Sequence, residues 1–286
     1  MKRVEARAPV RLDLAGGWTD VPPYTFDVGG EVVNVAINIH AHASLEIDGE
    51  GRLSVNYRCD APVGSGLGTT GAINVALMAA INGADNAEEA AYQFEALLGN
   101  TGGRQDQWAA KHGGFNHLIF IGDSVEEMPF DPPRSARFWL QKHLIVANTG
   151  IPHVSGELHD VIWEKYAAKD EGVIEGLMTI RLAARKMSQG LDQDRRDLVV
   201  ESLQDICEGV DALDPALHDP FREVVNPLLE SRNVVGWKAL GAGGGGCVAL
   251  LSGPERQQAV IAACEAAGWD VLEWDYDDEG LVINAS

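Results

Sequence analysis

The sequence predicts a mixed fold of strands and helices, with a strand-rich first half and a more helical second half. Residues 31–39, 43–47 and 53–57 are rich in β-branched side chains and are predicted as strands. Residues 156–209 show the long spacing of Leu, Ile, Val and Met that is typical of helices. The tail predicts a helix at 255–267 followed by extended segments, like half of a ferredoxin-like unit.

Length and charge limit the class of protein. A chain of 286 residues can form one large domain or two moderate domains with real cores. Its formal net charge of -21 would repel nucleic acids and anionic membranes, so we expect neither as a partner. The four cysteines are scattered, and we see neither a signal peptide nor an apolar span. We therefore expect a reduced, cytoplasmic protein.

The first predicted strand, residues 4–14, alternates polar and apolar side chains. Arg11 and Asp13 fall on the same face of this strand, because side chains two residues apart point to the same side. An arginine beside an active-site carboxylate would fit that face.

Residues 15–24 then form a rigid polar loop with two glycines and two prolines. Thr19 and Asp20 could hydrogen-bond the neighbouring hydroxyls of a sugar, while Trp18 or Tyr24 lies against the face of its ring. The alternative is an Asx-type turn in which Asp20 caps backbone amides.

The stretch from 61 to 71 is predicted to bind phosphate. Three glycines at alternate positions let backbone N–H groups approach an anion. The unbroken apolar run at 73–81 predicts a helix whose positive end adds to this attraction. Thr69 and Thr70 stand at the helix opening, where a hydroxyl caps the helix or binds a metal. The loop has neither the Walker nor the dinucleotide spacing, and an ordinary glycine-rich turn is the alternative.

Two later segments carry candidate carboxylates. The predicted helix over 87–98 places Glu95 near its buried edge, where it is either solvated or faces a metal. The loop over 99–108 brings Asp106 to a helix start, where the default interpretation is an N-cap. Residues 115–121 and 138–147 are predicted as strands.

A second glycine-rich loop lies far along the chain. Residues 241–246 contain five glycines and lead directly into an apolar strand. Such a loop permits very close approach of its backbone to another group. A flexible linker would be more polar and would not end in a buried strand.

Four motifs in this order resemble those of the GHMP small-molecule kinases, and within them the sugar 1-kinases typified by heptose 7-phosphate kinase and L-fucokinase. One such motif is weak evidence, but four in order across nearly the whole chain are specific. They are residues 11–24, 64–70, 102–107 and 241–246.

The resemblance implies an α+β GHMP kinase fold, with an N-terminal ribosomal-protein-S5-like half, a C-terminal ferredoxin-like half, and ATP between them. It also implies an ATP- and sugar-binding domain over residues 1–150 and a C-terminal domain over 151–286. Compared with most relatives, the region between the first two motifs is short and lacks a predicted helix, which leaves the completeness of the nucleotide pocket open. The oligomeric state is not indicated.

Each motif receives a role from the resemblance. Asp106 would orient or deprotonate the sugar hydroxyl, and Arg11 would hold its charge. Thr70 and Glu95 would bind Mg²⁺. The nucleotide phosphates would be cradled by Pro62, Gly64, Ser65, Gly66, Leu67, Gly68, Thr69 and Thr70. The sugar would be contacted by Trp18, Thr19, Asp20, Gly103, Arg104, Gln105, Gly243 and Gly244.

The implied activity is Mg²⁺- and ATP-dependent phosphorylation of the anomeric (C1) hydroxyl of a sugar or sugar phosphate. D-glycero-D-manno-heptose 7-phosphate is the first predicted substrate, because residues 21–24 and 113–116 resemble heptose 7-phosphate kinase. L-fucose is the second, because residues 17–20 resemble fucokinase. A phosphorylated heptose needs a basic pocket, for which the candidates are Arg104, Lys111 and His112.

Two other classes are weaker alternatives. A catalytically silent ATP and sugar sensor could share this fold, since fold does not fix function. The presence of Asp106, Thr70 and Glu95 argues against it. The decarboxylases of the same superfamily are disfavoured by the sugar-like loop at 17–20.

Overall fold

The computed structural model describes residues 2–62, 64–100, 102–151 and 155–286, and it contains two antiparallel sheets. Sheet A has the order β10-β1-β2-β4-β5, and β3 also pairs with β2. Its strands are β1 (Lys2–Ala15), β2 (Gly30–Ile47), β3 (Leu53–Cys59), β4 (Phe115–Ile121), β5 (Ser124–Met128) and β10 (Val282–Ala285). Sheet B has the order β7-β8-β6-β9 and consists of β6 (Leu144–Asn148), β7 (Val234–Ala239), β8 (Cys247–Ser252) and β9 (Asp270–Leu272).

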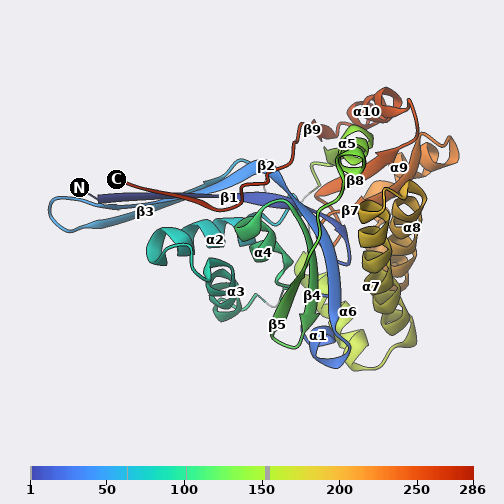
Figure 1. Cartoon of the computed structure of the whole chain (residues 1–286). Coiled ribbons are helices and arrows are strands. Elements are labelled where there is room, and N and C mark those ends of the chain that lie inside the picture. Colours follow the sequence, from blue (N-terminus) through green and yellow to red (C-terminus); the bar gives the residue numbers. More distant parts are fainter. Residues whose placement is uncertain (1, 63, 101, 152–154) are drawn as a thin grey trace.

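Helices cover both sides of sheet A. Figure 1 shows α2 (Thr69–Asn82), α3 (Ala87–Leu97) and α4 (Gln105–His112) on one side of β2, and α7 (Glu171–Asp192) and α8 (Arg196–Leu213) on the other. The first eight residues of β2 are all buried, because helices cover both faces of the strand there. The remaining helices are α1 (Tyr24–Asp27), α5 (Arg134–His143), α6 (Ser155–Ala167), α9 (Asp219–Glu230) and α10 (Gln257–Ala266).

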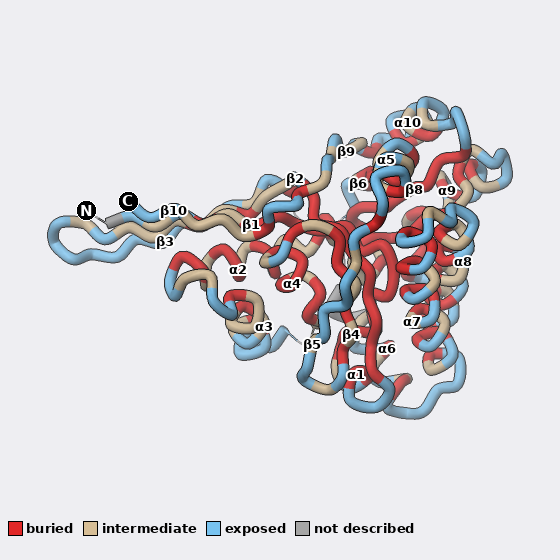
Figure 2. The backbone as a smooth tube through the Cα atoms, in the orientation of Figure 1, coloured by how far each residue is buried: buried red, intermediate tan, exposed pale blue. Residues whose placement is uncertain are grey.

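The far ends of β1 and β2 extend from the body as a wing together with β3 and β10 (Figure 1). The two chain ends meet there, with Val4 opposite Ala285. Figure 2 shows that the wing is mostly exposed or half-buried, whereas the crossing point of β1 and β2 is buried. Of strand β1, therefore, the inner end packs into the body of the molecule, and this end can form part of an enclosed site.

The sequence predicted the mixed character of the fold correctly, but the strands predicted over 31–39 and 43–47 are one strand, β2, and most of the strand predicted over 138–147 was wrong. Residues 134–143 of the segment around 138–147 form helix α5, and the strand is restricted to β6. Ala136, Leu140 and His143 are buried at helical spacing on one face of α5, while Phe138 is 67% exposed. The apolar residues of this helix join those of β6 without a break, which made the whole segment resemble one strand.

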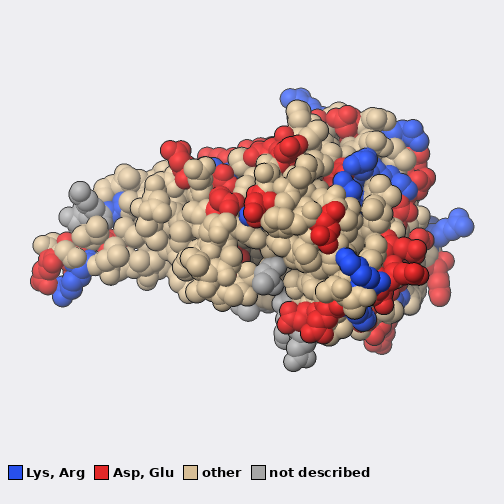
Figure 3. Space-filling view, turned by 90° about the horizontal axis from the view of Figure 1, so that it is seen from below, with Lys and Arg blue, Asp and Glu red and all other residues tan. Residues whose placement is uncertain are grey.

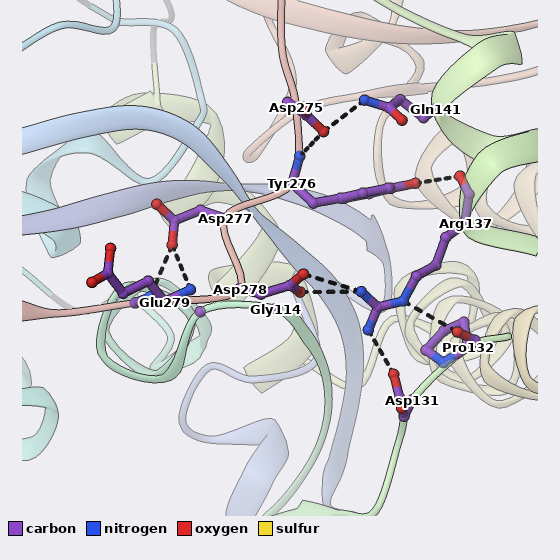
Figure 4. A network of polar contacts seen from close by, with 12 residues as sticks. Gly114, Asp131, Pro132, Arg137, Gln141, Asp275, Tyr276, Asp277, Asp278 and Glu279 are labelled. Atoms are coloured by element: carbon purple, nitrogen blue, oxygen red, sulfur yellow. Dashed lines mark hydrogen bonds and ion pairs between the residues drawn. The ribbon is translucent and has the colours of Figure 1, made fainter. Parts of the chain in front are cut away.

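The C-terminal segment joins the two sheets. Between β9 in sheet B and β10 in sheet A, the chain crosses β2, where Tyr276 lies opposite Ile37. Figure 4 shows the contacts of this crossing: Arg137 bonds Asp278 at 3.1 Å, and the Tyr276 hydroxyl donates to the Arg137 carbonyl at 2.7 Å. The last predicted strand, β10, therefore exists. It pairs with β1 in sheet A and is not part of sheet B, where a ferredoxin-like unit would place it.

The division into residues 1–150 and 151–286 remains a prediction. Strand β6 lies before residue 150 and pairs within sheet B, whereas β10 lies after it and pairs within sheet A. None of the helices in the described ranges is long and apolar enough to cross a membrane. In Figure 3, charged side chains gather at the tip of the wing and over the broad end, with mostly uncharged residues between them.

Candidate active site

A cavity of about 570 Å³ lies where the inner end of β1 meets the phosphate loop (residues 61–71) and the glycine-rich loop (residues 241–246). Residues from all four sequence motifs line it. In chain order the motifs are far apart, and the pairing of β1 with β2 and the packing of α2 and α4 on sheet A bring them together. The four sequence motifs thus lie together around one cavity.

Arg11 and Asp106 form an ion pair at this cavity. Arg11 lies on β1 and Asp106 in the first turn of α4. The Nε and Nη2 atoms of Arg11 lie 2.9 and 2.7 Å from Oδ1 of Asp106. A third contact, from Arg11 Nη1 to the Gly66 carbonyl at 2.6 Å, ties the pair to the phosphate loop. One buried guanidinium therefore fixes a carboxylate beside the predicted phosphate site.

The phosphate loop opens helix α2, which begins at Thr69. Five of its eight predicted nucleotide-binding residues line the cavity: Gly64, Gly66, Gly68, Thr69 and Thr70. The other three do not line it. Ser65 and Leu67 are fully buried, and Pro62 is half-buried.

The glycine-rich loop is packed directly against the phosphate loop. The N–H of Cys247, just after it, donates to the Ser65 carbonyl at 2.8 Å. A Cβ atom at Gly66 would lie 2.4 Å from the Leu240 carbonyl oxygen, so only glycine permits this approach. Gly241 and Ala242 line the cavity. The predicted sugar contacts Gly243 and Gly244 do not, and the Gly244 N–H donates to the Leu217 carbonyl.

Asp20 is a buried carboxylate that lines the same cavity. Its Oδ2 accepts a hydrogen bond from the Gln105 N–H at 3.1 Å. A Cβ at Gly103 would lie only 1.9 Å from this oxygen, so a glycine there lets the loop close over Asp20. Burial raises the pKa of Asp20, the hydrogen bond from Gln105 lowers it, and the negative charges of Asp106 and Asp13 raise it; the net result is a pKa of about 7.

The raised pKa of Asp20 predicts a pH dependence of stability. The folded state holds the proton up to about pH 7, whereas the unfolded chain loses it near the ordinary value of 3.8. Stability from this group is thus present below pH 3.8 and lost as pH rises to about 7. We expect the change from pH 5 to pH 8 to destabilise the wild type more than Asp20→Asn, by about 1 to 3 kcal/mol.

Urea unfolding of both proteins at the two pH values measures this difference. Asp197→Asn is the matched control, because Asp197 is an exposed carboxylate in the first turn of α8. Equal pH dependence in the wild type and Asp20→Asn would show that the folded state does not hold the Asp20 proton.

Trp18 forms an aromatic wall of the cavity. Its ring stacks on His159 of α6, with centroids 5.1 Å apart and planes inclined by 23°. Both rings line the cavity. Thr19 is not brought to it: the side chain is fully buried, and its hydroxyl donates to the Gly16 carbonyl at 2.7 Å. Thr19 therefore holds the shape of the loop that presents Trp18 and Asp20.

Glu95 faces the cavity from α3. Gln107 Nε2 donates to its Oε1 and Asn100 Nδ2 to its Oε2, each at 2.9 Å. Burial raises the pKa of Glu95 above its ordinary value, and Asp106 adds to the rise, whereas these amide hydrogen bonds lower it. Thr70 lines the same cavity, and the buried Oε1 of Gln107 has no partner among the described residues. Hydroxyl, carboxylate and amide oxygens are the donor set that fits a hard cation such as Mg²⁺.

The three basic candidates for a sugar phosphate are engaged elsewhere. Arg104 is buried, with its guanidinium 4.0 Å from the Tyr92 ring centroid. Lys111 donates to the Ala84 carbonyl at 2.5 Å, and His112 lies 3.2 Å from Glu127. None of the three lines the cavity. Gln105 and Gly103 do line it, so the loop over 99–108 contributes to the site without its arginine.

Some lining residues were not predicted as site residues. Asp13 was predicted on the same strand face as Arg11, but its partner was not predicted: Lys238 Nζ donates a hydrogen bond to Asp13 Oδ2 at 2.7 Å. His159 and Asp160 belong to a long helical segment with no local signal of a site. Gln107 follows Asp106 directly, Asn100 precedes Gly103 in the same loop, and their amide character was the available signal.

Comparisons with known proteins identify the family and the relatives that this chain resembles. Residues 31–114 match the family model of the GHMP kinases N terminal domain. The D-glycero-alpha-D-manno-heptose 7-phosphate kinase of Campylobacter jejuni is 23% identical over 98% of this chain and 98% of its own. The bifunctional fucokinase/GDP-fucose pyrophosphorylase of Arabidopsis thaliana is 22% identical over 88% of this chain and 30% of its own.

A solved structure shows the same fold. The crystal structure of a D-glycero-D-manno-heptose 1-phosphate kinase from Bacteroides thetaiotaomicron matches with a TM-score of 0.80 at 21% identity, over 98% of each chain. The predicted α+β GHMP kinase fold is therefore confirmed, and so is the prediction of a kinase. Residues 31–114 therefore match the N-terminal domain of the GHMP kinases, the chain has the fold of those kinases, and its full-length relative is a kinase.

Proposed function

We propose that this kinase transfers the γ-phosphoryl group of ATP to the anomeric hydroxyl of a sugar, most directly D-glycero-D-manno-heptose 7-phosphate. The Arg11–Asp106 pair beside the phosphate loop is the observation that carries the proposal. A relative that aligns with the whole chain is a heptose 7-phosphate kinase, which supports the choice of substrate. Asp20, Gln105 and Trp18 supply hydrogen-bonding groups and an aromatic face for the sugar.

Asp106 acts on the attacking hydroxyl. Both contacts from Arg11 go to its Oδ1, so Oδ2 is the oxygen that accepts the hydroxyl proton. The sugar oxygen then attacks the γ-phosphorus, and the bond to ADP breaks. An anomeric hydroxyl is more acidic than an ordinary alcohol, so a carboxylate is a sufficient base. Most of the remaining catalysis is positioning and charge stabilisation by the phosphate loop.

Thr70 and Glu95 would hold Mg²⁺, and Gln107 would add its unpartnered amide oxygen. A bound Mg²⁺ neutralises charge on the transferring phosphoryl group. The hydrogen bonds from Asn100 and Gln107 hold the Glu95 carboxylate toward the cavity without help from the ion.

A free sugar such as L-fucose is the second candidate, and one observation favours it. In the described part of the chain, Arg11 is the lone Lys or Arg side chain on the cavity wall, against five carboxylates: Asp13, Asp20, Glu95, Asp106 and Asp160. A phosphorylated sugar needs positive charge for its second phosphate. The fucokinase relative supports this candidate.

The test is ADP release from ATP with a panel of free sugars and sugar phosphates, with and without Mg²⁺. We expect turnover of one sugar that depends on Mg²⁺, with phosphorus NMR locating the new phosphate on C1. Phosphorylation of heptose 7-phosphate but not fucose selects the first candidate, and the reverse selects the second. Binding of ATP and a sugar without any turnover would overturn the kinase proposal and favour a sensor.

A further inference from the structure

Asp13 is a buried carboxylate on the cavity wall that the reaction described above does not use. It lies on β1, two positions after Arg11, and its side chain is 1% exposed. Its Oδ2 accepts a hydrogen bond from Lys238 Nζ at 2.7 Å. Its Oδ1 is buried and has no hydrogen-bond partner among the described residues.

An unpartnered buried carboxylate oxygen needs an explanation. Leaving such an oxygen without a donor costs free energy, and most buried polar atoms in folded proteins have a partner. An ion pair that served only to hold β1 to β7 would gain from a second donor on Oδ1. Asp13 itself is one of the residues that line the cavity, together with Arg11 and Asp106.

A second open acceptor lies beside it. Gly17 separates the two side chains: a Cβ there would lie 2.0 Å from Asp13 Oδ2 and 3.2 Å from Gln105 Nε2. The Oε1 atom of Gln105 is also buried without a partner in the described ranges. Asp20, whose pKa is raised partly by the charge of Asp13, is close to both. Asp13 Oδ1 and Gln105 Oε1 are thus two buried acceptors without donors, on two residues that line the cavity.

We infer that Asp13 is a specificity-determining residue that accepts a hydrogen bond from a sugar hydroxyl other than the one phosphorylated. A sugar is rich in hydroxyl donors, which are what these acceptors lack. Lys238 is a positioning residue: it bonds Oδ2 and so leaves Oδ1 for the sugar. The inference rests on the proposed function, because it requires a polyhydroxylated substrate beside Asp106.

The double variant Asp13→Val/Lys238→Met separates this role from a purely structural one. It replaces a buried ion pair by apolar groups of similar size, a change that is often neutral for stability. We expect the KM for the sugar to rise about 10- to 100-fold, which corresponds to the loss of one hydrogen bond to a charged group. The KM for ATP should stay within about twofold, since the phosphate loop is unchanged.

The conservative variant Asp13→Asn covers the case in which the double variant does not fold. Asn has the shape of Asp and keeps one oxygen that accepts a hydrogen bond more weakly. We therefore expect a smaller rise in the KM for the sugar than in the double variant. Glu31→Gln is the matched control, because Glu31 is also 1% exposed and also paired, with Arg185 at 2.8 Å, but it does not line the cavity. This control should leave the KM for the sugar unchanged.

A set of deoxy-sugars identifies the hydroxyl. Wild type should discriminate against the analogue that lacks the hydroxyl bonded by Asp13, and the double variant should turn over that analogue and the full sugar equally well. A folded double variant with the wild-type KM for the sugar would overturn the inference and leave the proposed function standing. Absence of wild-type turnover on every sugar would instead overturn the proposed function, and the role of Asp13 with it.

Discussion

Replacing Asp106 by Asn should lower kcat with the preferred sugar by about 10³-fold, the middle of the range for loss of a general base. Asn keeps the shape of Asp and an Oδ1 that accepts from Arg11, so the contacts that now measure 2.9 and 2.7 Å can persist. The amide cannot take the hydroxyl proton. Because we propose that ATP binds through the phosphate loop, its KM should change little. Steady-state ADP release at saturating sugar and ATP measures both quantities.

Asp192→Asn is the control for Asp106→Asn. Asp192 ends α7 as an exposed carboxylate, and it does not line the cavity. Its substitution should leave kcat unchanged. If Asp106→Asn retained more than about a tenth of the wild-type kcat, with an unchanged melting temperature, the loss would be too small for a general base. The base would then have to be another of the cavity carboxylates.

Local chemistry made most of the fold and the phosphate loop predictable from the sequence. Glycines at alternate positions before an apolar helical run predict a phosphate loop, and the structure places Gly64, Gly66 and Gly68 on the cavity wall, while their binding of phosphate stays a prediction. The strand over 115–121 and the helix over 87–98 follow from their hydrophobic period. Helix α5 was missed because its apolar residues run into those of β6 and hide the change of period.

Contacts between distant segments were not predictable. Lys238 and Asp13 are 225 positions apart, and their hydrogen bond joins β7 of sheet B to β1 of sheet A. The burial of Arg104 was not predictable either: it has the charge expected of a substrate contact, but its guanidinium is buried over the Tyr92 ring. Residue type shows which charges and hydrogen bonds a side chain offers. Whether that side chain faces the cavity or is buried elsewhere depends on contacts between distant segments.

Gly66→Ala should damage both stability and ATP use, because the phosphate loop and the glycine-rich loop touch at this residue. Its φ of +73° favours glycine, and a side chain there costs about 1 to 2 kcal/mol. The new Cβ would also lie 2.4 Å from the Leu240 carbonyl oxygen, and relieving that overlap costs roughly another 1 to 3 kcal/mol. A loop displaced by about 1 Å should lower kcat/KM for ATP on the order of 100-fold.

Gly268→Ala separates the two costs of the Gly66 substitution. Gly268 follows α10 with a φ of +76°, and nothing lies within 4 Å of a Cβ built there. It carries the same backbone cost without the overlap, so urea unfolding should show a loss of about 1 to 2 kcal/mol and ATP kinetics should be unchanged. The difference between the two variants then measures the contact between the loops. Equal losses of stability and equal ATP kinetics would mean that the glycine-rich loop does not press on the phosphate loop, and that closure of the site depends on other contacts.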